Sequence, residues 1–390
     1  MDFSYSADEE RFRTDLRAWL ERNPPGREPE DPKAWVPYAK AWQAKLAEAG
    51  WCGVAWPKEY GGRGATLIQQ IIFQEELARA RAPQFIGLAG LTMGGPVLIA
   101  HGTDEQKQRH LRPILRADEI WCQGFSEPNA GSDLAAIKTK AVLDGDSFVV
   151  SGQKVWTSWA RYAEVCMCLV RTDPDAPKHK GITFLLVDMK SPGVTVRPLT
   201  QMNGDADFNE VFFEDVRVPR KNIVGEMNKG WDIAITCLMH ERQTLTFSRQ
   251  LQSKVALTEM LETARRHERG GTPATRDPIV RQALSRAFVD SEAMRFLAYR
   301  NLTKVLRGGV PGPEGSIEKL FWSEMYQRQL DVACEIIGPH GQLLRHSKHA
   351  VDGGRWPHLL LYSKGRTIAA GTSEVQRNII AERVLGLPRG

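Results

Sequence analysis

Glycine, serine and aromatic residues recur in short windows of the chain that could hold a flat, polar ligand. Residues 123–133 read QGFSEPNAGSD, and such a loop can bring backbone N–H groups and hydroxyls close to a ligand rich in hydrogen-bond acceptors. By itself this window is more typical of a capped turn. Residues 152–158 read GQKVWTS, where an indole could cover an aromatic ring while a serine hydroxyl two residues later donates to a ring nitrogen.

Two further places carry groups that could act on a carbonyl compound. Gly371-Thr372-Ser373-Glu374 opens the last expected helix, so free N–H groups and the positive end of the helix dipole are available to an anionic or carbonyl oxygen. Glu241 and Arg242 stand in the middle of a long expected helix, where such a pair is by itself more typical of a solvated surface.

Cysteine and histidine residues show no metal-binding pattern. The six cysteines include no Cys-x-x-Cys pair, and His340, His346 and His349 lie close together without the spacing of a metal motif. Cys166 and Cys168 are two residues apart in an apolar stretch, as residues on one face of a strand would be. We therefore expect reduced, buried thiols and no metal site.

The composition is that of an ordinary globular protein. The chain has 390 residues, more than one hydrophobic core usually supports, with 42% hydrophobic and 25% charged residues. No apolar run approaches the ~20 residues that a membrane helix needs. The amino terminus enters a helical pattern at once and leaves no room for a signal or transit peptide. We expect a soluble, cytoplasmic protein with two or three packed regions.

The net charge of +5 does not by itself indicate a nucleic-acid partner. Lysines and arginines are scattered among nearly as many acidic residues and form no basic block or aromatic-interleaved stripe. A polyanionic small ligand fits the charge equally well, and we expect no nucleic-acid binding.

Hydrophobic periodicity predicts helices in the first part of the chain. Phe12, Leu16 and Leu20 recur on one helical face, and Ser6 followed by Glu9 is a capping box. Further helices are expected around Trp42 and Leu46, from Leu67 to Leu77, and after the capping pair Thr103 and Gln106.

From about residue 120 the pattern changes to short strands, and after residue 226 it returns to long helices. The expected strands are residues 147–150, 165–170, 182–187, 194–196 and 211–213, with an exposed hairpin loop around Pro174 and Pro177. The expected long helices are residues 229–269, 277–307, 314–337 and 373–385. We predict a mixed, mainly α protein with an N-terminal α-helical domain (1–119), a central β-domain forming a small barrel or sandwich (120–226) and a C-terminal four-helix bundle (227–390).

Taken together, the motifs resemble the acyl-CoA dehydrogenase family, and the resemblance covers nearly the whole chain. It is carried by Glu59-Tyr60-Gly61-Gly62, the loop 126–133, Lys154-Val155-Trp156 and the turn 371–373. Each motif is modest, but their order and spacing together are specific. The resemblance implies that a helical domain, a β-domain and a helical bundle enclose FAD, and that the enzyme desaturates an acyl-CoA thioester between its α and β carbons.

The resemblance also implies roles for individual residues. Ser158 matches a hydroxyl near the flavin N5 atom, which receives the β-hydride, and Glu374 stands where glutamine is more familiar. The implied FAD contacts are Gln123, Phe125, Ser126, Ser132, Trp156, Thr157, Ser158, Glu335, Gly338, Thr372 and Glu374. The implied substrate contacts are Ser132, Arg242, Ala370 and Gly371.

The catalytic base is expected at Glu241. Many members carry a glutamate directly before the Gly-Thr-Ser turn, but this sequence has Ala370 there, which cannot take a proton. A second branch, with isovaleryl-type and long-chain members, carries the base on the first long C-terminal helix in a Glu-Arg pair, matched here by Glu241 and Arg242. The backbone N–H of Ala370 could still bind the thioester oxygen.

Two departures from the family pattern bear on how FAD is held. The Arg-x-x-Phe-Gly element, which in relatives reaches the FAD of a neighbouring subunit, has no match around residues 265–278. Glu335 replaces the usual glutamine of a stretch that ends at Gly341. Such departures are similar to those of actinobacterial dehydrogenases of sterol side-chain catabolism, some of which work as two unlike chains.

These features lead to a preferred function and to alternatives. We expect a branched, bulky or long acyl-CoA as substrate, electron-transfer flavoprotein as electron acceptor, and a homodimer or homotetramer or a heteromer with a second dehydrogenase chain. A half-site subunit that completes a partner's FAD site, and a flavin oxidase or monooxygenase on the same scaffold, are the alternative enzymes. A non-enzymatic helical scaffold is the remaining possibility.

Overall fold

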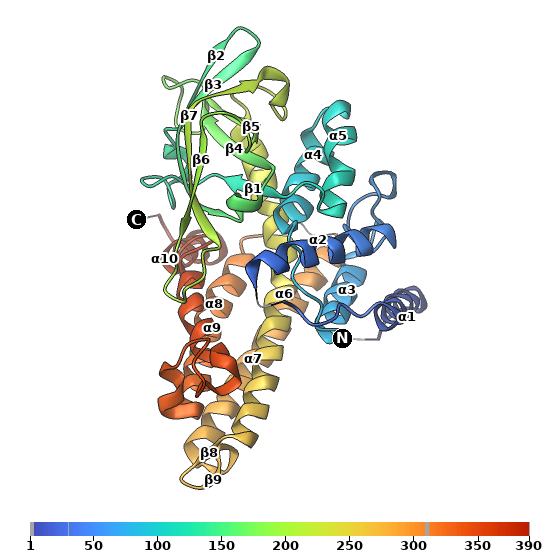
Figure 1. Cartoon of the computed structure of the whole chain (residues 1–390), viewed down its shortest axis with the longest axis vertical. Coiled ribbons are helices and arrows are strands. Elements are labelled where there is room, and N and C mark those ends of the chain that lie inside the picture. The colour runs from blue at the N-terminus through green and yellow to red at the C-terminus, as the bar shows by residue number, and fades with distance from the viewer. Residues whose placement is uncertain (1–3, 30, 309–311, 390) are drawn as a thin grey trace. The chain divides into compact units, whose positions relative to one another are not determined.

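The computed structural model of the chain describes residues 4–29, 31–308 and 312–389 (Figure 1). Side chains are described for these residues except residue 32 and residues 240–248. Contacts divide the chain into two units. The first comprises Met1–Thr200 and Ala206–Thr244, and the second comprises Gln201–Asp205 and Leu245–Gly390.

Amphipathic helices open the first unit, as the sequence predicts. They are α1 (Ala7–Arg22), α2 (Pro32–Glu48), α3 (Leu67–Arg79), α4 (Gly95–His101) and α5 (Asp104–Arg116). Ser6 and Glu9 form the predicted capping box of α1, and Thr103 and Gln106 form that of α5. Both predicted helix starts are therefore confirmed.

Helix α4 was not predicted, because glycines stand at its first residue and directly before it, at Gly95 and Gly94. A Cβ atom on Gly95 would lie 1.9 Å from the Trp56 ring, and one on Gly94 would lie 2.6 Å from the Trp121 ring. Glycine therefore lets this helix approach two buried indoles closely, and that tertiary packing outweighs its low helix propensity.

A seven-stranded sheet forms the second part of the first unit, with strand order β1-β4-β2-β3-β7-β6 and β5 paired to β4 (Figure 1). The strands are β1 (Trp121–Gly124), β2 (Lys140–Asp144), β3 (Ser147–Ser158), β4 (Val165–Arg171), β5 (Ile182–Asp188), β6 (Val194–Leu199) and β7 (Phe208–Pro219). The loop between antiparallel β4 and β5 is the predicted hairpin loop. The predicted fold class, mainly helical around a central sheet, is confirmed, whereas the three-domain division at residues 119 and 226 stays a prediction.

Strand β4 is buried on both faces, which explains its unbroken apolar sequence. Val165, Met167 and Leu169 pack into a core shared with the N-terminal helices. Cys166 and Cys168 point to the other face, into the core between the strands, and both are buried free thiols as predicted. Hydrogen bonding with a neighbouring thiol and then burial raise the pKa of each thiol, so both remain protonated.

Strands β3, β6 and β7 are each at least three residues longer than the sequence predicted. Strand β3 continues from residue 150 to Ser158 through polar residues, and its pairing with β7 contains two register shifts. A β-bulge places an extra residue in one strand, so the two-residue alternation that identifies a strand in a sequence is interrupted there.

Long helices make up most of the second unit, and the first of them, α6, begins within the first unit. They are α6 (Gly230–Arg266), α7 (Pro278–Leu306), α8 (Gly315–Ile337), α9 (Arg355–Ser363) and α10 (Ser373–Ile379), and a short hairpin of β8 (Glu268–Arg269) and β9 (Thr272–Pro273) follows α6. The sequence did not predict α9, which begins directly after the left-handed Gly354. Among the described residues no helix has the length and apolar character needed to span a membrane.

Candidate active site

The end of strand β3 turns an indole away from the sheet. The β3–β7 register shifts between Lys154 and Thr157, and Trp156 within this bulge has a φ of 60°. A left-handed backbone is uncommon for a bulky side chain, and such strain concentrates at functional sites. The Trp156 side chain is 61% exposed and meets the Phe208 ring edge-on, with ring centroids 6.1 Å apart. Its indole is therefore available to a ligand.

Strand alternation decides which side chains next to Trp156 can reach the same ligand. Thr157 is fully buried, and its hydroxyl has no hydrogen-bond partner among the described residues. The Thr157 carbonyl accepts a hydrogen bond from Asn209 Nδ2 at 2.9 Å, which fixes the strand end. Ser158 is half-buried. The accessible side chains of this window are therefore Trp156 and Ser158, while Thr157 faces the protein interior.

A buried ion pair joins the first two sequence windows. Lys154 is fully buried, and its Nζ donates to Glu127 Oε1 at 2.8 Å and to the Phe125 carbonyl at 3.1 Å. Glu127 also accepts from the N–H groups of Lys138 and Thr139, at 2.6 and 2.9 Å. Burial by itself raises the pKa of Glu127, but the Lys154 charge and these hydrogen bonds together lower it below its ordinary value. An ionised pair therefore holds the loop and the strand end together.

The loop after β1 lies directly against the end of β3, because the Val155 N–H donates to the Ser126 carbonyl at 2.9 Å. Gln123 is half-buried at the end of β1. Among the described residues, its amide nitrogen contacts the sulfur atoms of Met93 and Cys237, at 3.5 and 3.7 Å. Sulfur is a weak acceptor, so the amide can turn to a better partner in a ligand.

The rest of the loop grades from buried to exposed. Phe125 is buried edge-on to Phe184, with ring centroids 6.0 Å apart, whereas Ser132 is exposed. Arg171 Nη2 donates to the Ala135 carbonyl at 2.7 Å and so anchors the end of the loop. The first unit thus brings together Gln123, Phe125, Ser126, Trp156, Thr157 and Ser158, with Ser132 on the exposed part of the loop.

A tight turn before α10 carries the third window, in the second unit. Ala370 and Gly371 have positive φ values of 55° and 86°. Thr372 then caps α10, its hydroxyl accepting from the Val375 N–H at 3.2 Å. Gln376 Nε2 donates to the Ala370 carbonyl at 3.0 Å. Ala370 and, one residue past the helix start, Glu374 are exposed.

Lys319 of α8 also holds this turn, a role that the sequence patterns did not reveal. Its side chain is 4% exposed, and its Nζ donates to the Gly371 carbonyl at 2.6 Å. The sequence did carry one signal that Lys319 is buried. Trp322, Ser323 and Tyr326 follow it at helical spacing, which places all four residues on one face of α8.

Helix α8 separates two groups of predicted cofactor residues within the second unit. Lys319 near its start contacts the turn, whereas Glu335 lies ~24 Å further along the helix axis by the helical rise. Glu335 is exposed, and Gly338 is the C-cap residue with a φ of 56°. Glu335 and Gly338 therefore lie far from the Gly371 turn within this unit.

The expected base and its neighbour, Glu241 and Arg242, lie on α6 but outside the residues whose side chains are described. Their assignment stays a prediction. The nearest described part of the helix on the N-terminal side includes Cys237, which is the residue in contact with Gln123.

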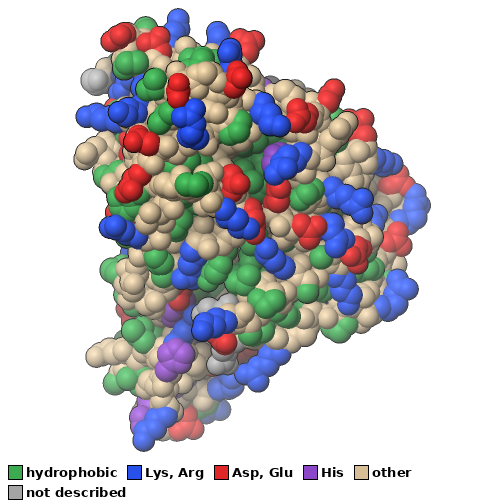
Figure 2. Space-filling view, turned by 45° about the horizontal axis from the view of Figure 1, so that its top comes forward, with side chains coloured by type: hydrophobic (Ala, Val, Ile, Leu, Met, Phe, Trp, Pro, Cys, Tyr) green, Lys and Arg blue, Asp and Glu red, His purple; other side chains and the backbone are tan. Residues whose placement is uncertain are grey.

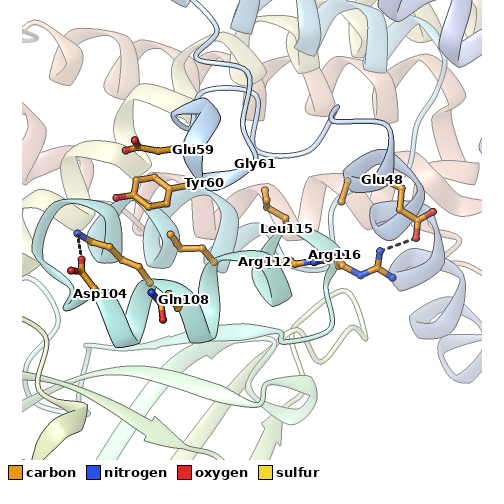
Figure 3. A pocket seen from close by; sticks show the side chains of 12 residues that line it. Glu48, Glu59, Tyr60, Gly61, Asp104, Gln108, Arg112, Leu115 and Arg116 are labelled. Atoms are coloured by element: carbon orange, nitrogen blue, oxygen red, sulfur yellow. Dashed lines mark hydrogen bonds and ion pairs between the residues drawn. The ribbon is translucent and has the colours of Figure 1, made fainter.

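A separate groove of about 710 Å³ lies between the 3-10 turn Lys58–Tyr60 and α5 (Figure 3). Tyr60 and Gly61 of the Glu-Tyr-Gly-Gly motif line it, opposite Gln108 and Arg112 of α5. An ion pair lies near each end of the groove, Lys107 with Asp104 and Arg116 with Glu48. None of the residues expected to bind cofactor or substrate lines this groove.

The protein surface shows no concentration of one charge on the face drawn in Figure 2, where basic and acidic side chains are interspersed. No group of three or more His, Cys, Asp or Glu side chains in the described part of the chain could hold a metal ion. His340, one of the three neighbouring histidines, contacts the His349 carbonyl through Nδ1 at 3.1 Å.

Family models match almost the whole chain, in the order helical, sheet, helical. Residues 6–118 match the acyl-CoA dehydrogenase N-terminal domain, residues 122–216 the middle domain and residues 228–385 the C-terminal domain. The chain belongs to the acyl-CoA dehydrogenase family. The resemblance inferred from the sequence motifs is confirmed.

Relatives of this acyl-CoA dehydrogenase include mycobacterial proteins. The acyl-CoA dehydrogenase IpdE1 of Mycobacterium tuberculosis is 40% identical over 98% of each chain. Among solved structures, the Tcur3481-Tcur3483 steroid ACAD is 32% identical with a TM-score of 0.87, covering 100% of both chains. The ChsE4-ChsE5 complex from Mycobacterium tuberculosis is 33% identical with a TM-score of 0.86, again covering 100% of both chains.

Proposed function

We propose that this acyl-CoA dehydrogenase uses FAD to desaturate an acyl-CoA thioester between its α and β carbons. The observation that carries the proposal is the cluster at the end of β3, where an exposed indole, a half-buried serine hydroxyl and a weakly bonded glutamine amide lie together. An aromatic face flanked by donors suits a flat ring rich in acceptors, so the residues fit FAD. When bound, FAD supplies the acceptor for the β-hydride.

Residues of the two sheet windows are proposed to hold the cofactor in different ways. Trp156 covers the ring and Ser158 donates to it, while the Lys154–Glu127 pair keeps the two loops in register. This arrangement is supported by the hydrogen bond from the Val155 N–H to the Ser126 carbonyl, which joins the loop 123–133 to the end of β3. The full proposed set of cofactor contacts is Gln123, Phe125, Ser126, Ser132, Trp156, Thr157, Ser158, Glu335, Gly338, Thr372 and Glu374. Thr157 is proposed to contribute backbone atoms, because its side chain faces the interior.

We propose Glu241 as the group that takes the α-proton. Ala370, at the position where many members carry the base, has no ionisable side chain. A carboxylate on α6 is the alternative that the family pattern offers, and Glu241 is followed by Arg242 as in that branch. Arg242, Ser132, Ala370 and Gly371 are the proposed substrate contacts.

The backbone of the Ala370–Gly371 turn is proposed to bind the thioester oxygen. An N–H group that donates to this oxygen stabilises the negative charge that develops when the α-proton leaves. Support comes from the turn itself, since its carbonyls are occupied by Gln376 and Lys319. The N–H groups of the same two peptides, which belong to Gly371 and Thr372, are proposed to donate to the ligand.

The substrate is proposed to be branched, bulky or long. Support comes from the helix-borne base and from the similar Tcur3481-Tcur3483 structure, which is described as a steroid ACAD. Electron-transfer flavoprotein is the proposed electron acceptor. The similar ChsE4-ChsE5 structure is a complex of two named chains, which supports testing for an unlike partner as well as for a homo-oligomer.

The experiment is an anaerobic titration of the purified protein with butyryl-CoA, isobutyryl-CoA, palmitoyl-CoA and the CoA thioester of a steroid carboxylic acid, following the visible flavin absorbance. Bleaching by a bulky or long thioester is expected; bleaching by short linear thioesters alone would refute the proposed substrate class. Colourless protein that gains flavin with a second dehydrogenase chain would indicate a half-site subunit. Peroxide release during turnover in air would indicate an oxidase.

The proposed base is tested by Glu241→Gln, which keeps the shape of the side chain and removes its proton acceptor. Loss of general-base catalysis should slow flavin reduction by ~10² to 10⁴-fold with FAD still bound. Glu262→Gln is the matched control, because Glu262 is an exposed glutamate on the same helix. Normal reduction in Glu241→Gln would show that the base lies elsewhere.

A further inference from the structure

Lys319 is a buried lysine in an unfavourable place. It lies in the apolar stripe of α8 with 4% of its surface exposed. Among the described residues no carboxylate lies within ion-pair distance of its ammonium group, and its hydrogen bond is to the neutral Gly371 carbonyl. Burial first and the charge of Arg249 second lower the pKa of Lys319 to about 8. An apolar side chain here would avoid this desolvation.

The charges around Lys319 come from three helices. Arg249 of α6 opposes its protonation, while Glu324 of α8 and Glu374 of α10 favour it more weakly. Glu374 is exposed at the helix start, so solvent screens its effect. The surroundings therefore do not account for a lysine at this position through ion pairing.

The contact that Lys319 does make controls a peptide of the turn. In a planar trans peptide the N–H points opposite to the C=O. Since Lys319 holds the Gly371 carbonyl and Gln376 holds the Ala370 carbonyl, the N–H groups of Thr372 and Gly371 are directed away from those two side chains. No described residue accepts a hydrogen bond from the N–H of Ala370, Gly371 or Thr372.

The backbone of this turn also needs to be held. Ala370 and Gly371 are consecutive residues with positive φ, and the first of them is not glycine. An alanine in the left-handed region persists where the surroundings fix it. Lys319 and Gln376 are the side chains that fix it from the carbonyl side.

We propose that Lys319 is a positioning residue of the dehydrogenase reaction, which orients the Ala370–Thr372 turn so that its N–H groups receive the thioester oxygen of the substrate. This inference rests on the proposed function. Lys319 does not touch the substrate itself and acts through the Gly371 carbonyl. The structure thereby gives a reason for a lysine that burial disfavours.

The test is Lys319→Met, which preserves the length and burial of the side chain and removes the donor. Because the buried cation is removed, Tm is expected to stay unchanged or rise. Flavin reduction at saturating acyl-CoA is expected to slow by ~10-fold or more, since an oxyanion donor typically contributes ~10² to 10³-fold. The dissociation constant of the CoA thioester should change by less than the rate, because most of the CoA moiety binds elsewhere.

A second variant and a control complete the experiment. Lys319→Gln retains a shorter donor and should recover part of the rate. Lys304→Met removes an exposed lysine that pairs with Glu314 outside the turn, and its reduction rate should match the wild type. Each variant is measured with the thioester that reduces wild-type protein fastest among isobutyryl-CoA, palmitoyl-CoA and a steroid carboxylic acid CoA thioester.

The outcomes separate the two claims. Wild-type rates in Lys319→Met would overturn the positioning role and leave the proposed function intact. A fall in Tm that accompanies the loss of rate in both Lys319 variants would show a merely structural role and also overturn it. Failure of every thioester to reduce the wild-type flavin would overturn the proposed function, and the positioning role with it.

Discussion

Two buried lysines, Lys154 in the sheet and Lys319 in the second unit, perform similar tasks with different electrostatic support. Lys154 donates to the Phe125 carbonyl and Lys319 to the Gly371 carbonyl, so each holds the backbone of a loop expected to contact a ligand. Lys154 is paired with the Glu127 carboxylate at 2.8 Å. Lys319 has Arg249 as its strongest charged neighbour. Lys154 is therefore integral to the folded structure, whereas the burial of Lys319 opposes stability.

Strained backbone occurs close to both lysines. Trp156 and Ala370 are both non-glycine residues with positive φ, of 60° and 55°. Strain of this kind is retained where the surrounding structure determines it, and it clusters at functional sites. Lys319 holds the Ala370–Gly371 turn directly, whereas Trp156 lies two residues after Lys154, whose charge is paired with Glu127.

Glu127→Gln should produce the largest loss of stability, because it leaves Lys154 charged and buried without its partner. Breaking a buried pair costs about 3–5 kcal/mol in the free energy of unfolding. The double change Glu127→Leu and Lys154→Met should restore most of it. Chemical unfolding measures both.

The control for that experiment is Asp144→Asn, which breaks the exposed pair with Arg217. An exposed pair contributes roughly 0–1 kcal/mol, so this change should have little effect. A loss in Glu127→Gln no larger than the loss in the control would remove the contrast between the two lysines. The Glu127 contribution is also pH-dependent: since its folded pKa is lowered, it is present above the unfolded pKa and lost as the pH falls.

Lys319→Met should alter the pH dependence of stability by an intermediate amount. The pKa of Lys319 falls from 10.5 to about 8 on folding, so between these values the unfolded chain holds a proton that the folded chain has released. The free energy of unfolding of the wild type should therefore rise with pH across this window relative to the variant, by up to about 3 kcal/mol. Denaturant midpoints below pH 8 and near pH 10.5 measure the difference. If the wild type and the variant differ in free energy of unfolding by the same amount at both pH values, burial does not disfavour the charged lysine.

Trp156→Ala should have the smallest effect on the fold. The indole is 61% exposed, so its removal should change the free energy of unfolding by less than about 1 kcal/mol. Flavin retention through gel filtration should nevertheless fall, because the ring loses its aromatic cover. Full flavin retention in this variant would separate the exposed turn from cofactor binding.

The sequence predicted the elements whose pattern is local. The capping residues Ser6 and Thr103 were sufficient to place two helix starts, and the spacing of Cys166 and Cys168 placed both thiols on one face of a strand. Helix α4 was missed, because Gly94 and Gly95 at its start read as helix breakers. They are needed there because the helix packs against Trp56 and Trp121, which lie elsewhere in the sequence. Long-range packing of this kind leaves no periodic signal.

The arrangement of the candidate site could be predicted only in part, for the same reason, and the roles of its residues stay predictions. The windows around Gln123 and Trp156 could be found from their composition, but the pairing of Lys154 with Glu127 depends on the sheet. The bulge that turns out Trp156 and the contact of Lys319 with Gly371 arise from tertiary structure.

The most direct test of the proposed chemistry is exchange of the α-hydrogen of the bound acyl-CoA with solvent deuterium, followed by mass spectrometry. The wild type should incorporate deuterium at the α-carbon, and Glu241→Gln should not, while Glu262→Gln should behave as the wild type. Exchange at the wild-type rate in Glu241→Gln would contradict the assignment of the base.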